Sequence, residues 1–80
     1  MSRPYYFGSA RRSLRAKANA DGVAASNAAL AAVKAKDLDG ARALFEAAAD
    51  HFKAAGVYDR QVQCIRAIGY LEGYAARMAS

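Results

Sequence analysis

The sequence has no tryptophan, one proline (Pro4) and single copies of cysteine and histidine. A lone cysteine excludes an internal disulfide, and Cys64 with His51 provides too few ligands for a structural zinc site. No apolar run approaches the roughly 20 residues that a bilayer-spanning helix needs. We therefore expect no metal, no cofactor and no membrane span, and we expect the protein in the reducing cytoplasm.

The chain also lacks the alternating β-branched residues that strands require. Alanine is instead the commonest residue, at 22 of 80 positions, and it loses no side-chain entropy in a helix. Eighty residues suffice for one small domain that buries only about 60–65% of its unfolded surface. We predict an all-α fold: a small bundle of three to four helices with a central antiparallel helical hairpin.

Acidic residues are absent from the first 20 positions, where Arg3, Arg11, Arg12, Arg15 and Lys17 concentrate the net charge of +5. The rest of the chain is balanced, with seven basic and seven acidic residues. Such segregation is typical of a surface that meets an anionic partner, either an acidic protein surface or nucleic acid. An organellar transit peptide has a similar composition, but Leu14 is the only large aliphatic residue here, which disfavours that alternative.

Residues 1–8 are predicted to form an N-terminal arm with aromatic and basic residues, and residues 9–80 a single helical domain. The arm holds Pro4 and an aromatic triplet that must dock on the body or face a partner. Ser9 is a suitable N-cap for a first helical stretch. Asp21-Gly22 is the best candidate for a break, so residues 9–36 are either one helix or two.

A second helix is predicted from the turn at residues 36–40 to about Ala55, with Asp37 as its cap and Gly56 as its stop. Its apolar face comprises Leu38, Ala41, Leu44, Phe45, Ala48, Ala49, Phe52 and Ala55. A third helix is predicted from Asp59 almost to the end, with an apolar stripe of Cys64, Ile65, Ile68, Leu71, Ala75 and Met78. Gly69 and Gly73 in this helix would let another backbone come close.

The middle of the chain resembles a tetratricopeptide repeat. Residues 36–48 follow that repeat's turn and second helix, with Ala41 and Ala48 at its small positions and Phe45 at its aromatic position. The resemblance covers about residues 23–79, or one and a half repeats, with Ala29 at the small position of the first helix. Lys53 departs from the pattern, because proline is usual there. The resemblance implies a helical hairpin and the binding of peptides or proteins.

In size and in its lack of catalytic motifs, the chain also resembles the small inhibitor proteins of phages and plasmids, of which anti-CRISPR proteins are one class. His51 is adjacent to Asp50 in sequence, which places the two side chains on different lines of a helix, and no nucleophile accompanies them. We therefore predict a protein that is not an enzyme. A small protein-binding module that occupies a partner's surface is the favoured function, and a nucleic-acid-binding accessory protein is the alternative.

Two sets of residues are candidate binding sites. The first is the basic set Arg11, Arg12, Arg15 and Lys17, suited to an acidic protein surface or to phosphates. The second lies within about 80° on the third helix and comprises Arg66, Tyr70, Tyr74 and Arg77. Tyrosine and arginine are enriched at protein interfaces, so this set predicts a partner-binding stripe. Alternatively, the two tyrosines cover the N-terminal helix. Association with a second copy is left open.

Overall fold

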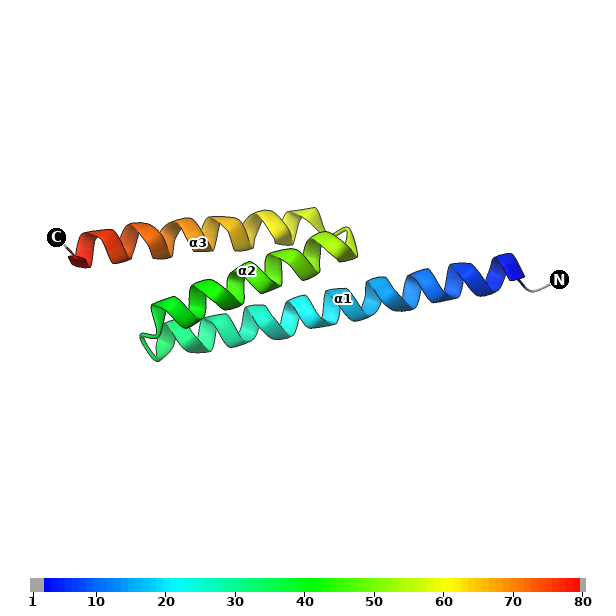
Figure 1. The fold of residues 1–80 in the computed structure, drawn as a ribbon, viewed down its shortest axis with the longest axis horizontal. Helices are drawn as coiled ribbons and strands as arrows, with labels where there is room; N and C mark the ends of the chain where they lie inside the picture. The colour runs from blue at the N-terminus through cyan, green and yellow to red at the C-terminus, as the bar shows by residue number, and fades with distance from the viewer. Residues whose placement is uncertain (1–2, 80) are drawn as a thin grey trace.

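The computed structural model describes the backbone of residues 3–79 and the side chains of residues 12–79. It contains three helices: α1 (Arg3–Lys34), α2 (Leu38–Ala55) and α3 (Tyr58–Ala79). Short turns join them, and successive helices run in opposite directions with α2 between the other two (Figure 1). Over the described residues every element is a helix, which confirms the predicted all-α class and gives the number of helices as three.

Helix α1 is continuous from Arg3, so the predicted start at Ser9 is wrong, and of the two alternatives for residues 9–36 the structure has one helix, without a break at Asp21-Gly22. Gly22 lies inside the helix and faces Phe52 of α2 at very close range. A Cβ atom at Gly22 would lie 2.8 Å from a ring carbon of Phe52, closer than carbon atoms normally approach. The glycine therefore provides space for an aromatic ring and does not interrupt the helix.

Residues 3–8 of the predicted arm form the first part of α1. Their side chains, including the aromatic triplet, lie outside the described side chains, as does that of Arg11. The division into an arm over 1–8 and a domain over 9–80 therefore stays a prediction.

The ends of α2 follow the sequence closely. The backbone N–H of Gly40 donates to Asp37 Oδ1 at 3.0 Å, which caps the first turn as predicted. Gly56 adopts a left-handed conformation with φ 76°, and its N–H donates to the carbonyl of Lys53 at 3.0 Å. Such a C-terminal glycine ends the helix because it takes a positive φ without a Cβ penalty. Tyr58 begins α3, one residue before the predicted start at Asp59.

The buried core is small and consists of Ala29, Ala41, Phe45, Ala48, Ala49, Phe52 and Cys64. Five of these seven lie on α2, on the face that the sequence pattern predicted. Only the two phenylalanines are large, so the alanines act mainly by letting the helices approach closely. Helix α2 packs against both neighbours, whereas α1 and α3 barely touch each other.

The predicted apolar stripe of α3 needs a correction. Cys64 is buried and Ile68 and Leu71 are half-buried, as expected, but Ile65, Ala75 and Met78 are exposed. The half-buried Ala67 takes part in the packing instead. Ile65 thus lies off the contact face of α3, and every described residue after Leu71 is exposed, so the contact face ends there. Among the described residues, no helix has the length and apolar character needed to cross a membrane.

Candidate functional site

A groove runs between α1 and α3, with α2 as its floor. Two hollows make it up, of ≈ 460 Å³ and ≈ 800 Å³, and both are lined by Leu30, Phe45 and Ala67. Because these three residues come from α1, α2 and α3 respectively, the hollows are two parts of one groove. It exists because α1 and α3 each pack on α2 without closing on one another.

The larger hollow is mainly apolar. Leu30 and Val33 of α1 face it, and the side chains of Leu71, Tyr74 and Met78 are on the α3 side. Leu30 is 53% exposed and Met78 69%, although both are large apolar side chains. Exposed apolar groups gathered in a groove are typical of a surface that a partner covers.

Tyr70 and Tyr74 both line this hollow. They are 78% and 47% exposed, so α1 does not cover them. Their angular position places them beside the contact face of α3, on the side that looks towards α1. A tyrosine there offers a broad apolar ring with a hydroxyl group that remains accessible for hydrogen bonding.

Of the two arginines in the predicted stripe, only Arg77 lines the groove. Arg77 lines the groove together with Lys36, which lies in the turn between α1 and α2. Arg66 is exposed but does not line either hollow. The structure thus brings Tyr70, Tyr74 and Arg77 together at the groove and places Arg66 beyond its edge.

The other end of the groove is more polar. Ser26, Asn27 and Gln63 line the smaller hollow together with Arg60. The guanidinium carbon of Arg60 lies 5.7 Å from the ring centroid of Phe52, which is a cation–π contact. This contact holds a positive charge where the groove opens near the α2–α3 turn.

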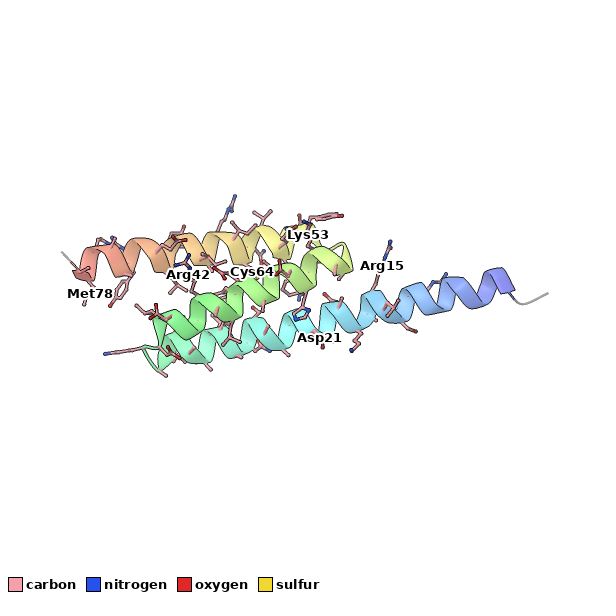
Figure 2. The ribbon with its side chains drawn as sticks, in the orientation of Figure 1. Arg15, Asp21, Arg42, Lys53, Cys64 and Met78 are labelled. Carbon is pink, nitrogen blue, oxygen red and sulfur yellow. The ribbon has the colours of Figure 1, made fainter. Side chains whose placement is uncertain are left out.

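The described part of the basic set lies on the portion of α1 that projects beyond the rest of the molecule (Figure 1). Arg12, Arg15 and Lys17 are exposed, as is every residue from 12 to 17, and Ala18 is the first half-buried position. Arg15 points from α1 towards the side on which α2 and α3 lie (Figure 2). No acidic residue precedes Asp21, so this segment presents an unopposed positive field.

Cys64 and His51 are the remaining candidates for reactive groups. Cys64 is buried in the core, and its burial raises the pKa of the thiol, which disfavours the nucleophilic thiolate. His51 is half-buried at the edge of α2. Within the described residues, no three His, Cys, Asp or Glu side chains come together in a group that could hold a metal ion.

Sequence reasoning missed Leu30, Met78 and Arg60 as groove residues. Met78 was assigned to the apolar stripe of the third helix, and an apolar pattern does not distinguish a buried position from one that lines an open groove. The available signal was the shortage of helices, since a chain of three helices has apolar faces in excess of what it can bury.

Comparison of the chain with protein-family models, with curated proteins and with solved structures gave no match in any of the three.

Proposed function

We propose that this chain is a non-enzymatic protein-binding module and that its contact surface is the groove between α1 and α3. The observation that carries the proposal is the exposure of Tyr70 and Tyr74 beside Leu30 in a groove with a mainly apolar lining. Buried aromatic anchors dominate the energy of many interfaces, because they bring large contact area at a small loss of conformational entropy.

The shape of the molecule supports the same reading. One and a half tetratricopeptide-like repeats would produce a helical hairpin followed by a single helix, and repeats of this type bind peptides and proteins. A module of this size acts by occupying a surface, so a partner that needs that surface would be inhibited. An inhibitor carried by a phage or plasmid, of the anti-CRISPR type, is the specific form of the proposal that the size and the lack of catalytic groups favour.

The test is a comparison of two double variants in affinity capture and in a direct binding assay with the captured partner. Tyr70→Ala with Tyr74→Ala should weaken binding at least tenfold and leave helicity nearly unchanged, because both rings are exposed. Val62→Ala with Ile65→Ala is the control, since these large apolar side chains of the same helix are also exposed, at 45% and 52%, but do not line the groove. Equal binding by both variants would refute the groove as the contact surface.

A nucleic-acid-binding accessory role is the second candidate, favoured by the exposed basic segment at Arg12, Arg15 and Lys17. If Arg11 also takes part, about four phosphates would be neutralised. The slope of the logarithm of the binding constant against the logarithm of the salt concentration would then be about −3 to −4. A gel-shift titration with DNA and RNA at several salt concentrations measures this slope. The absence of any shift at low salt would eliminate this candidate.

A further inference from the structure

We infer that the groove and the basic segment of α1 form one continuous surface, and that its occupant is an amphipathic helix with an acidic end, belonging to a different protein. This inference rests on the proposed function and adds the chemistry of the partner. Four observations carry it: the angular position of the arginines, the charge of the groove lining, the parallel walls of the groove and the charge of the chain itself.

The arginines share a face of α1 with the groove. Arg12 precedes Leu30 by eighteen residues, and Arg15 precedes Val33 by the same number. Eighteen residues are five full turns at 3.6 residues per turn, so each arginine lies on the same line of the helix as its groove residue. Because α1 is unbroken, this alignment is preserved along its length. Figure 2 shows Arg15 on the side of α1 that faces the rest of the molecule.

The groove itself is positive at both ends. Arg60 lies at the end near the α2–α3 turn, and Lys36 and Arg77 lie at the other. No acidic residue is among those that line the two hollows. An occupant therefore meets an apolar floor, cations at each end and further cations beyond, and negative charge on its flanks is the complement.

The two helices that form the walls of the groove, α1 and α3, favour a helix as the occupant. Helices α1 and α3 run in the same direction, with α2 between them (Figure 1), and both contribute residues to the groove lining. A fourth helix laid between them would complete a four-helix arrangement and cover Leu30 and the tyrosines, with its apolar side facing inward. From Arg12 to Val33, α1 rises about 32 Å at 1.5 Å per residue, so a helix of about 21 residues would follow the whole surface.

Charge also selects among occupants. The projecting segment of a second copy is basic, so it would be repelled by the cations of the groove. A nucleic acid would satisfy the arginines, but its phosphates gain nothing from the apolar lining around Leu30, Leu71 and Met78. A helix of another protein, apolar on one side and acidic at the end that meets Arg12 and Arg15, satisfies both parts of the surface.

Three synthetic peptides of equal length serve as probes. The first has leucines at i, i+3, i+4 and i+7 spacing with glutamates at its flanks and one end. The second replaces every glutamate by lysine, and the third shuffles the first so that the apolar stripe is lost. Binding to the intact chain is followed by NMR chemical-shift changes up to millimolar concentration. We expect the first peptide to bind at least tenfold more tightly than the other two, with shifts at Leu30, Tyr70 and Tyr74.

Charge reversal tests the continuity. Arg12→Glu with Arg15→Glu should lower the affinity for the acidic peptide at least tenfold at low salt. The same variant should bind the lysine peptide more tightly than the parent does. Arg66→Glu with Lys53→Glu is the matched control, because it makes the same total change of charge at two exposed cations that do not line the groove.

The outcomes distinguish failure of this inference from failure of the proposed function. Equal binding of the acidic and lysine peptides in the groove, or no effect of reversal at Arg12 and Arg15, overturns the inference and leaves the groove as a binding site. No shift at the groove with any peptide overturns the proposed function as well. Concentration-dependent self-association through the groove, or oligonucleotide binding that displaces the acidic peptide from it, identifies a different occupant and also overturns the inference.

Discussion

Phe45 is one of the two large side chains in the buried core. It is 6% exposed, lies in the middle of α2 and forms the floor under both parts of the groove. Removal of a buried phenylalanine side chain costs about 3–5 kcal/mol, which is comparable with the total stability of about 5 kcal/mol at the low end for small domains. We expect Phe45→Ala to be unfolded or molten in a circular dichroism melt, whereas a melting temperature within a few degrees of the parent would contradict the assigned core.

Gly22 and Gly69 provide a matched pair at the residue scale, because both are helical glycines with opposite surroundings. A methyl group at Gly22 would collide with the buried ring of Phe52, while nothing lies within 4 Å of a methyl group at Gly69. Alanine gains up to about 1 kcal/mol of helix propensity over glycine, and overpacking costs about 1–3 kcal/mol. Gly22→Ala should therefore lower the melting temperature and Gly69→Ala should raise it by about 4–8 °C. A higher melting temperature in both variants would show that Gly22 does not pack against the ring of Phe52.

Cys64 gives the structure a pH-dependent signature. Because burial raises its pKa, the folded chain holds less thiolate than the unfolded chain at any alkaline pH. We expect slow reaction with a thiol reagent at pH 8 in the native state and fast reaction in urea. The stability linked to this thiol is complete below the unfolded pKa of about 8.5 and is lost as the pH rises through the higher folded pKa. Equal rates with and without urea would show that the thiol is accessible.

At the scale of the element, α1 is expected to work as one rigid rod that sets the angle between the arginines and the groove. Two alanines inserted after Ala18 would rotate Arg12 and Arg15 by about 200°, and four would rotate them by about 40°, while the two insertions differ by only about 3 Å in length. The four-residue insertion should therefore retain most of the preference for the acidic peptide, and the two-residue insertion should lose it. Equal affinities of the two insertion variants for the acidic peptide would show that the angle between the arginines and the groove does not affect binding.

Helices α2 and α3 differ in how far their sequences predict their packing. Helix α2 was predictable in full, because its cap at Asp37, its stop at Gly56 and its single apolar face all agree. Helix α3 has apolar residues over more than one face, so periodicity could not indicate which of them would meet α2. Ile65 and Met78 were thus placed in the core and are exposed. For the site, Tyr70, Tyr74 and Arg77 were identifiable by residue type, but the groove beside them depends on a separation of α1 and α3 that no local pattern encodes.

The whole molecule is elongated. Its Cα atoms extend over 65 × 19 × 13 Å with a radius of gyration of 15.9 Å, where a compact chain of this length would have about 12 Å. The projecting part of α1 accounts for much of the difference (Figure 1). Small-angle scattering from the free chain should give a radius near the larger value. A radius near about 12 Å would mean that the segment folds back onto the body.

The arrangement in which α2 alone contacts both neighbours has a consequence for how the chain folds. Every major contact joins helices that are consecutive in sequence, so no distant segments have to find each other before the structure can form. Chains with such local contacts reach the native state in microseconds to milliseconds, since the entropy lost in closing each loop is small. Each helical pair can form around α2 separately. The detachment of α3 would then be a partial unfolding event that opens the groove while α1 and α2 stay paired.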